Sequence, residues 1–399
     1  MSLNSTPSSE RIHIGFFGKR NAGKSSLINA ITNQELAIVS DIKGTTTDPV
    51  YKAMELLPLG PVSVIDTAGY DDNGELGKLR IEKTKQVLNK IDIAVLVVDA
   101  SVGLEQGDKD FISLFEEKNI KYIITYNKCD LLETTLNKNN EIYVSAKENI
   151  NIEELKNLIS SLCVETQEKQ ALVKDLVFPS DIVILVTPID ASAPKGRLIL
   201  PQQQVIRELL EAGAITQIVQ PDKLRNAIDN CKNKPKFVIT DSQAFKKVDS
   251  VINGEIPLTS FSILFARYKG ILEYAVKGVK QLDKLEDNDT ILISEGCTHH
   301  RQCEDIGTVK LPNWIKNYTS KNLNFEFSSG NTFPTDLSKY KMVIHCGGCM
   351  LKDKEVLNRY KQAFEQNISI SNYGITIAYI NGILKRSIEI FPNLYNLLK

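Results

Sequence analysis

The sequence has no excess of charge of either sign. Its 48 lysines and arginines are matched by 49 aspartates and glutamates, which gives a formal net charge of −1 at pH 7. A global positive field that would hold a polyanion such as RNA or DNA is therefore missing. This balance argues against a nucleic-acid partner.

Long apolar runs and a targeting signal are also missing. The longest apolar runs, such as IAVLVV at 93–98, have the length of a strand and fall far short of the roughly 20 residues that a membrane span needs. The first ten residues, MSLNSTPSSE, lack the cationic start and apolar core of a signal peptide. We therefore expect a disordered tail at 1–10, no membrane segment and a cytoplasmic protein.

The 399 residues are enough for two to four domains, since domains usually hold about 100 to 200 residues. No fixed short repeat is present. Short β-branched runs instead alternate with helical patterns, which predicts parallel-type sheets wrapped by helices. One such series ends near the polar stretch ETQEKQ, a second follows it, and a third begins near residue 261. Strands of the second and third series are predicted at 182–187, 237–240, 290–294, 325–327 and 342–345.

The most specific motif is GKRNAGKS at 18–25, which fits the phosphate-binding pattern GxxxxGK[ST]. It follows the apolar run IHIGFF and opens a helical pattern, as the motif requires. Its glycines let backbone N–H groups point at phosphate oxygens, beside the positive end of the helix. We expect Lys24 to reach the β and γ phosphates and Ser25 to ligate magnesium. The nucleotide-binding residues expected here are Gly18, Asn21, Ala22, Gly23, Lys24, Ser25 and Ser26.

Two further segments are expected to sense the γ phosphate. In DTAG at 66–69, the Asp66 carboxylate can hold magnesium through water and the Gly69 N–H can contact the γ phosphate. In GTTTD at 44–48, a threonine can ligate magnesium only while that phosphate is present. The triple threonine leaves the register open, and we favour Thr46. The expected catalytic residues are Lys24, Thr46, Asp66 and Gly69.

Two later motifs predict guanine specificity. In NKCD at 127–130, the Asp130 carboxylate can accept hydrogen bonds from both the N1–H and the exocyclic amine of guanine. Adenine has no such pair of donors, so roughly a thousandfold discrimination or better is expected. Ser145, Ala146 and Lys147 would supply a backbone donor to the guanine O6 and pack beside Asp130. The expected base-binding residues are Asn127, Lys128, Asp130, Ser145, Ala146 and Lys147.

With these motifs, the first ~165 residues resemble the GTPases of the Era and TrmE type. That resemblance implies GTP hydrolysis to GDP and phosphate, and a potassium ion at Asn21 and the segment 40–46. Tyr70 follows DTAG where Ras-like GTPases carry the glutamine that orients water. The acidic candidates downstream are Asp71, Asp72 and Glu75, each of which is more typical of an exposed loop residue. A potassium ion would offset charge on the phosphates, which makes catalysis mainly electrostatic.

The third series gathers four of the seven cysteines and three of the four histidines. Cys297 follows the predicted strand 290–294, and HCGGC at 345–349 follows the predicted strand 342–345. Both groups therefore lie at the carboxyl ends of strands, where open α/β sheets place ligands. The Gly-Gly pair lets the backbone curl so that both sulfurs point at one centre. Thiolate ligands suit zinc or an iron–sulfur cluster.

A CxH motif followed about fifty residues later by HCxxC, joined to an Era-like GTPase domain, resembles the HydF family of FeFe-hydrogenase maturation GTPases and scaffolds. The resemblance extends through the run TPIDASAPKGRLILPQQQ at 187–204. It implies a 4Fe-4S cluster, a homodimer formed by the middle segment, and delivery of a diiron precursor to the FeFe-hydrogenase apoprotein, alongside radical-SAM maturases. The residues that match the motif are Cys297, His299, His345, Cys346 and Cys349, of which the three cysteines would ligate the cluster.

Three cysteines leave one iron of a four-iron cube to another ligand. His299 and His345 are candidates, with Glu304 and Asp305 as carboxylate alternatives, and an exchangeable exogenous ligand is equally open. Cys303 is either a ligand or a bystander. An exchangeable position could receive another metallocluster, which fits a scaffold.

The predicted fold class is therefore α/β, with a P-loop GTPase domain on a parallel-type sheet followed by two smaller α/β domains. The expected boundaries are a tail at 1–10, a GTP-binding domain at 11–165, a dimerisation domain at 166–262 and an iron–sulfur cluster-binding domain at 263–399. The alternative is an Era/TrmE-like RNA or ribosome assembly GTPase with a zinc-binding C-terminal domain. Balanced charge and the lack of a GXXG segment in a KH-like context weigh against it.

Overall fold

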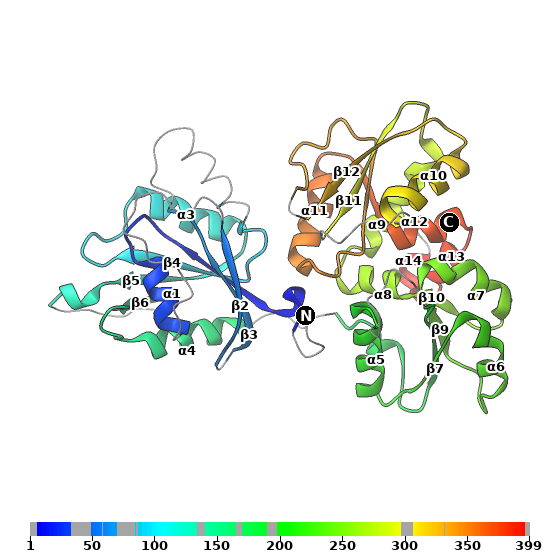
Figure 1. The fold of residues 1–399 in the computed structure, drawn as a ribbon, viewed down its shortest axis with the longest axis horizontal. Helices are drawn as coiled ribbons and strands as arrows, with labels where there is room; N and C mark the ends of the chain where they lie inside the picture. The colour runs from blue at the N-terminus through cyan, green and yellow to red at the C-terminus, as the bar shows by residue number, and fades with distance from the viewer. Residues whose placement is uncertain are drawn as a thin grey trace. The chain divides into compact units, whose positions relative to one another are not determined.

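A computed structural model describes residues 6–32, 49–57, 59–69, 84, 87–133, 140–164, 170–189, 198–296, 306–330 and 332–395. The chain divides into two compact units, Met1–Glu168 and Lys169–Lys399 (Figure 1). Among the described residues, no helix is long and apolar enough to cross a membrane.

The first unit is built on a six-stranded sheet with the order β2-β3-β1-β4-β5-β6. Every neighbouring pair is parallel except β2 with β3. Strand β4 is buried almost throughout because apolar clusters cover both faces of the sheet. The strands are β1 (Ile12–Phe17), β2 (Val50–Leu56), β3 (Gly60–Asp66), β4 (Ile93–Asp99), β5 (Lys121–Asn127) and β6 (Glu141–Val144), and the helices include α1 (Lys24–Thr32), α3 (Gln106–Glu117) and α4 (Ile152–Val164).

The topology of this sheet fixes where a ligand can bind. Strand β1 lies between β3 and β4, so the chain leaves β1 towards one side of the sheet and later returns on the other. The carboxyl end of β1 is thus the switch point at which open α/β sheets bind ligands. The segment 18–25 begins at this end.

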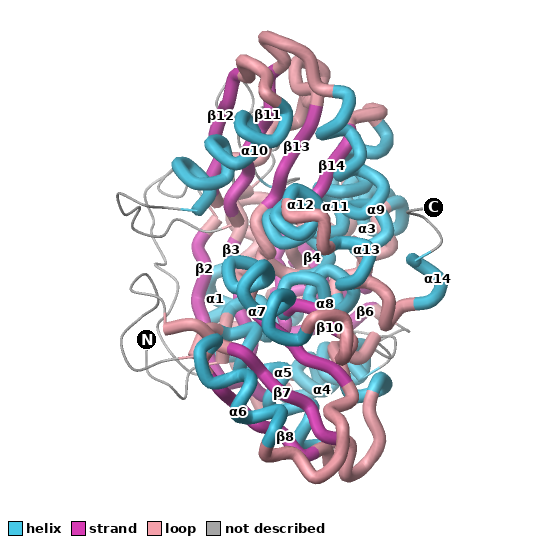
Figure 2. The backbone as a smooth tube through the Cα atoms, turned by 90° about the vertical axis from the view of Figure 1, so that its right-hand side faces the viewer, coloured by secondary structure: helices cyan, strands magenta, loops and turns pink. Residues whose placement is uncertain are grey.

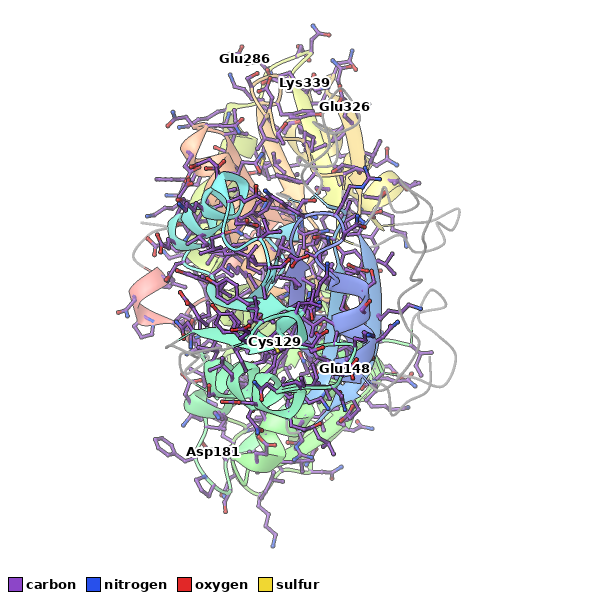
Figure 3. The ribbon with its side chains drawn as sticks, turned by 90° about the vertical axis from the view of Figure 1, so that its left-hand side faces the viewer. Cys129, Glu148, Asp181, Glu286, Glu326 and Lys339 are labelled. Atoms are coloured by element: carbon purple, nitrogen blue, oxygen red, sulfur yellow. The ribbon has the colours of Figure 1, made fainter. Side chains whose placement is uncertain are left out.

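The second unit contains two parallel four-stranded sheets. One has the order β10-β9-β7-β8 and the other β12-β11-β13-β14. An ion pair of 2.7 Å between Glu326 and Lys339 joins β12 to the segment before β13 (Figure 3). The strands are β7 (Ile182–Val186), β8 (Ile215–Val219), β9 (Phe237–Thr240), β10 (Leu258–Ser260), β11 (Thr290–Glu295), β12 (Asn324–Ser329), β13 (Met342–His345) and β14 (Ser369–Asn372).

Helices surround both sheets, and several lie between them (Figure 2). They are α5 (Leu200–Glu211), α6 (Leu224–Asp229), α7 (Phe245–Ile252), α8 (Phe261–Tyr268), α9 (Leu272–Gly278), α10 (Leu311–Thr319), α11 (Asp353–Glu365), α12 (Tyr373–Ile380), α13 (Leu384–Ser387) and α14 (Pro392–Tyr395). Helices α8 and α12 pack against each other. At Gly374 an added Cβ would lie 1.9 Å from Ser262 Oγ, so only glycine permits this approach.

The two smaller α/β domains expected from the sequence are present as the two sheets, but their cores are joined. One apolar cluster runs from Leu172 to Phe391 and includes strands of both sheets. The boundary predicted at 262/263 falls inside α8, which belongs to this shared core. The second unit is therefore one packed body.

Part of the predicted N-terminal tail has regular structure. Ser8–Glu10 form a 3-10 helix in which Ser9 is buried. The Ser8 carbonyl lies 2.9 Å from His13 Nε2, and Arg11 Nε donates to the Thr6 carbonyl at 3.1 Å. The expectation of a tail up to residue 10 is therefore wrong for these residues, because local hydrogen bonds fix them against β1. Residues 1–5 lie outside the described part of the chain.

Candidate functional site

The loop between β1 and α1 passes so close to its neighbours that glycine is required at two positions. Gly18 has a φ of +151°, and an added Cβ would lie 2.2 Å from the Val97 carbonyl oxygen on β4. Gly23 has a φ of +86°, and an added Cβ would lie 2.2 Å from Asn127 Nδ2 on β5. The motif glycines are thus explained by contact with the ends of two adjacent strands.

Lys24, Ser25 and Asp66 converge at the carboxyl ends of β1 and β3. The buried Lys24 Nζ donates to the carbonyls of Gly18 at 2.8 Å and Lys19 at 2.7 Å. Ser25 Oγ donates to Asp66 Oδ2 at 2.9 Å. Burial raises the pKa of Asp66, while the Ser25 hydrogen bond and the Lys24 charge oppose that rise. A hydroxyl, a carboxylate and an ammonium gathered here suit a magnesium-bound phosphate.

Asn127 connects the phosphate loop to the segment 145–147. It is 3% exposed; its Nδ2 donates to the Ala22 carbonyl at 3.0 Å, and its Oδ1 accepts from the Ala146 N–H at 3.1 Å. Ser145 is also buried, and its Oγ accepts from the Glu148 N–H at 3.1 Å. The Asn127 side chain thereby holds the phosphate loop and the segment 145–147 at a fixed distance from each other, although they lie more than 100 residues apart in the sequence.

The other members of the base motifs lie at the open rim of the site. Asp130 and Lys147 are both exposed, so their polar groups face solvent. Lys128 has a φ of +68°, and its Nζ pairs with Asp99 Oδ2 at 2.5 Å. Burial acts to raise the pKa of Asp99, but hydrogen bonds from Lys128 and Ser101, together with the Lys128 charge, lower it.

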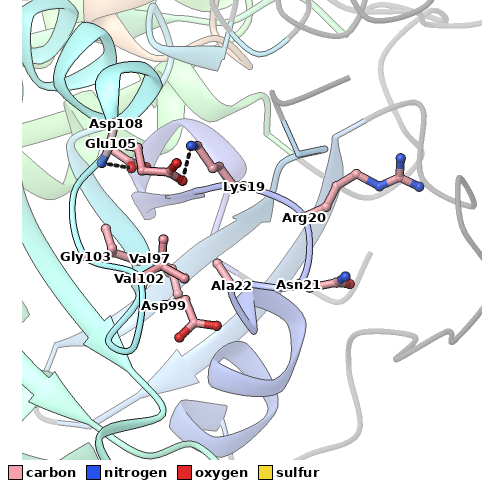
Figure 4. A pocket seen from close by; sticks show the side chains of 11 residues that line it. Lys19, Arg20, Asn21, Ala22, Val97, Asp99, Val102, Gly103, Glu105 and Asp108 are labelled. Atoms are coloured by element: carbon pink, nitrogen blue, oxygen red, sulfur yellow. Dashed lines mark hydrogen bonds and ion pairs between the residues drawn. The ribbon is translucent and has the colours of Figure 1, made fainter. Parts of the chain in front are cut away.

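A pocket of about 240 Å³ lies beside the phosphate loop (Figure 4). Lys19 reaches across it to an ion pair with Glu105, and the Glu105 N–H donates to Asp108 Oδ2 at 2.8 Å at the start of α3. The sequence reasoning missed Asp99 and Glu105. A signal existed for Asp99, because it ends β4 at the same sheet edge as the recognised motifs.

The remaining GTP-site residues that the structure describes lie just after β3 and between β1 and the first turn of α1. Gly69 is half-buried just beyond β3, and Thr67 Oγ1 donates to the Phe16 carbonyl at 2.7 Å, which fixes that end of β3 to β1. Ser26 is half-buried in the first turn of α1, and Asn21 is exposed with a φ of +60°. Thr46, the segment 40–46 and Tyr70 lie outside the described residues.

A second site is formed by residues 346–351, here called the cysteine loop. Cys346 Sγ accepts from the Gly296 N–H at 3.0 Å and from the Gly348 N–H at 3.3 Å. Gly348 has a φ of +61°, so the predicted curl occurs at the second glycine of the pair. Burial raises the pKa of both thiols; the two N–H donors oppose this at Cys346, and the Lys269 charge opposes it at Cys349.

In the structure both ring nitrogens of His345, a candidate metal ligand, already have hydrogen-bond partners. Its ring is fully buried, and Arg359 Nη1 lies 3.1 Å from Nε2. Since a guanidinium only donates, Nε2 must accept, so Nδ1 carries the proton that it donates to the Cys346 carbonyl at 2.7 Å. Burial, assisted by the Arg359 charge, lowers the pKa of His345 to about 3. Both ring nitrogens are occupied, so the neutral imidazole positions the chain before Cys346.

Two buried polar groups near this site were not anticipated. Lys269 follows α8, and its Nζ donates to the carbonyls of Gly348 at 2.7 Å and Leu351 at 2.9 Å. The Tyr360 hydroxyl is buried and has no hydrogen-bond partner among the residues that the structure describes. No sequence pattern separates this lysine from surface lysines, because its partners lie about 80 residues away.

The donors around the cysteine loop fit thiolate ligation of a metal cluster. Backbone N–H groups directed at sulfur and a buried ammonium stabilise anionic sulfur. Among the described residues, no three histidine, cysteine or acidic side chains gather as a metal site. Cys297, His299, Cys303, Glu304 and Asp305 lie outside the described residues.

Family models match three successive parts of the chain. A 50S ribosome-binding GTPase model matches residues 13–128, a Hydrogen maturase F dimerization domain matches 172–270, and a Hydrogen maturase F tetramerization domain matches 273–390. The first match includes the phosphate loop, and the third includes the cysteine loop.

Individual relatives resemble part of the chain. The tRNA modification GTPase MnmE of Carboxydothermus hydrogenoformans is 32% identical over 231 residues, which are 53% of this chain and 49% of that protein. The MnmE of Desulforamulus reducens is 36% identical over 156 residues, which are 37% of this chain and 34% of that protein. The chain thus spans half or less of the length of these relatives.

Among solved structures, Aquifex aeolicus Era bound to GDP and AlF4⁻ aligns with a TM-score of 0.35 at 16% identity, covering 61% of this chain and 98% of that one. The two Hydrogen maturase F models, in contrast, match consecutive segments that together make up more than half of the chain. A GTPase domain followed by these two domains means that the chain belongs to the HydF family of hydrogen maturases.

Proposed function

We propose that this chain hydrolyses GTP and serves as an iron–sulfur scaffold that carries a 4Fe-4S cluster and delivers a diiron precursor to an FeFe-hydrogenase apoprotein. One observation carries the proposal. The Gly296 N–H donates to Cys346 Sγ at 3.0 Å, and Gly296 immediately precedes Cys297 in the sequence. The residue directly before the first cysteine motif therefore contacts the second motif, about fifty residues later, which supports one shared site for both.

In the proposed cluster site, Cys297, Cys346 and Cys349 supply three thiolates. With His345 occupied by its own hydrogen bonds, His299, Glu304 and Asp305 remain as protein candidates for the fourth position, beside an exogenous ligand. When bound, the cluster would supply an iron with a replaceable ligand, to which a second metallocluster can be attached. The chain's own residues hold the thiolates, direct N–H groups at Cys346 and bury the loop.

In the proposed GTPase reaction, water attacks the γ phosphorus and the bond to the β-phosphate oxygen breaks, giving GDP and phosphate. Lys24 would move from its loop carbonyls to the phosphates, and Ser25 and Thr46 would ligate magnesium, with Asp66 behind a water. Gly69 would donate to the γ phosphate. A potassium ion at Asn21 would add positive charge where negative charge develops.

Base recognition in this proposal uses the rim of the site. The Asp130 carboxylate is free to face the N1–H and exocyclic amine of guanine, and Lys147 lies exposed on the same rim. Ala146 and Ser145 are already held in place through Asn127 and Glu148. Only the exposed residues would have to reorient when the base binds.

The same family implies that this chain associates with a second copy of itself. The exposed edge of the sheet β10-β9-β7-β8 supports this association. Strand β8 ends that sheet, and its Ile215 and Ile218 are 51% and 47% exposed. An open edge strand with apolar side chains invites pairing with another chain. We infer that a second copy covers β8, which lies within the stretch matched by the dimerization domain.

Free thiols and the implied partners support a reducing compartment for this activity. Among the described residues, Cys129, Cys231, Cys346 and Cys349 are free thiols. Thiols persist where glutathione or thioredoxin keeps them reduced, which fits a cytoplasmic protein acting with radical-SAM maturases.

Anaerobic purification with iron, sulfide and zinc analysis tests the proposal. We expect about four irons and four sulfides per chain, broad visible absorption, and GTP hydrolysis that survives loss of the cluster. Cys346→Ala and Cys349→Ala should each lose most of the iron, and Cys231→Ala, outside the site, should keep it. Full iron content in the double cysteine variant would refute the cluster assignment. One zinc per chain would favour the RNA-associated alternative.

A further inference from the structure

A buried cation joins the two parts of the second unit at the cysteine loop. Lys269 lies at the end of the stretch matched by the dimerization domain, and only 2% of its side chain is exposed. Its Nζ donates to the carbonyls of Gly348 and Leu351 at 2.7 and 2.9 Å, and lies 3.5 Å from Asp353 Oδ1. An ammonium from one matched domain thus holds the loop of the other.

Burying the Lys269 ammonium is unfavourable for stability, so its retention points to a role for the charge. Burying an ammonium removes its hydration, and a well-packed apolar residue of similar volume is often no less stabilising at such a position. One carboxylate and two carbonyls satisfy Lys269, yet Asp353 is about one third exposed and forms only a long ion pair. The positive charge also lies close to the thiol of Cys349, since the two carbonyls that accept from Lys269 belong to residues on either side of Cys349 in the sequence.

We propose that Lys269 is the positioning residue of the cysteine loop, holding residues 348–351 in the ligating conformation and raising the reduction potential of the cluster bound there. The part of this inference that concerns the cluster rests on the proposed function. The part that concerns the loop does not, because the hydrogen bonds exist in the protein alone.

The charge and the hydrogen bonds of Lys269 make separable contributions. Lys269→Met keeps the length of the side chain and removes both, whereas Lys269→Gln keeps N–H donors without the charge. Lys277→Met is the matched control, because Lys277 is an exposed lysine on α9 whose 2.7 Å ion pair with Glu273 is on the surface. Circular dichroism establishes that each variant is folded.

The first measurement uses metal-free, reduced protein and iodoacetamide, with mass spectrometry of the peptides that carry Cys346 and Cys349. Losing one hydrogen bond from a charged donor allows about tenfold more opening, so we expect at least about tenfold faster alkylation in Lys269→Met. Lys269→Gln should fall between Lys269→Met and wild type, and Lys277→Met should match wild type. Equal rates in all four proteins would overturn the positioning role, whether or not the protein binds iron.

The second measurement is the midpoint potential of the reconstituted cluster, with its electron paramagnetic resonance spectrum. Reduction adds negative charge, so removal of a nearby cation should shift the potential downward in Lys269→Met and in Lys269→Gln alike. An unchanged potential in both variants would overturn the electrostatic role. Absence of iron from wild-type protein would instead refute the proposed function, and the alkylation rates would still decide whether Lys269 holds the loop.

Discussion

Asn127→Ala should loosen the GTP site more than any other single change in the base motifs. The side chain is 3% exposed and joins the Ala22 carbonyl to the Ala146 N–H through hydrogen bonds of 3.0 and 3.1 Å. Alanine leaves both backbone groups without this partner. At about 1 kcal/mol each, the low end of the cost of a buried unsatisfied group, the link between the two loops loses about 2 kcal/mol.

Nucleotide binding requires both loops in place at once, so that loss reduces the fraction of competent molecules. A change of about 2 kcal/mol corresponds to an approximately 30-fold weaker Kd. The assay is titration of full-length protein with a fluorescent GTP analogue, with magnesium and potassium present.

Gln106→Ala is the control for this experiment. It removes one exposed side-chain hydrogen bond of 2.8 Å to Asp110 at the start of α3, away from the base motifs. Its Kd should stay within about twofold of wild type, since surface changes are usually small. A Kd for Asn127→Ala that equals the control would refute the view that this amide couples the two loops.

Three further predictions concern base choice, cation dependence and self-association. Asp130→Asn should change the preference from guanine to xanthine nucleotides, because xanthine offers an acceptor where guanine offers a donor; undiminished GTP turnover would contradict this. Potassium should stimulate hydrolysis far more than sodium, and equal rates at matched ionic strength would count against an ion at Asn21. Ile218→Lys on β8 should yield smaller particles in light scattering than an exposed change elsewhere, such as Lys247→Ala, and an unaltered mass would move the interface to another surface.

Motifs that depend on local sequence were predicted well. The phosphate loop was placed correctly after β1 because its glycines must pass within contact distance of β4 and β5. The strands of the second and third series with continuous apolar runs were also predicted. A strand that is buried on both faces of a sheet is apolar along its whole length, and that run is visible in the sequence.

Four strands at sheet edges, β2, β8, β10 and β14, were missed, whereas the edge strand β12 was predicted at 325–327. Strand β2 contains Lys52 and Glu55 and is largely exposed, so no apolar run marks it. Strands β8, β10 and β14 are short, and β14 reads Ser-Ile-Ser-Asn, which is equally typical of a turn. Their pairing depends on neighbours distant in the sequence, which a local pattern does not contain.

At the cysteine site too, the sequence predicted the local features but not the contacts between distant segments. Its position at the ends of strands was foreseen, and the structure bears it out for Cys346, which follows β13 directly. The role of His345 was not, because only the fold brings Arg359 to its Nε2. Lys269 was missed because the sequence gives no indication that this residue is buried.

The joined core of the second unit limits how far its two sheets can move relative to each other. Hinge motion needs a boundary that few contacts cross, but here α8 and α12 meet at Gly374 without space for a methyl group. The two hydrogen maturase segments therefore cannot swing apart while the apolar cluster stays intact. A displacement in one of these segments is therefore carried to the other through the shared core, to which Leu351 of the cysteine loop also belongs.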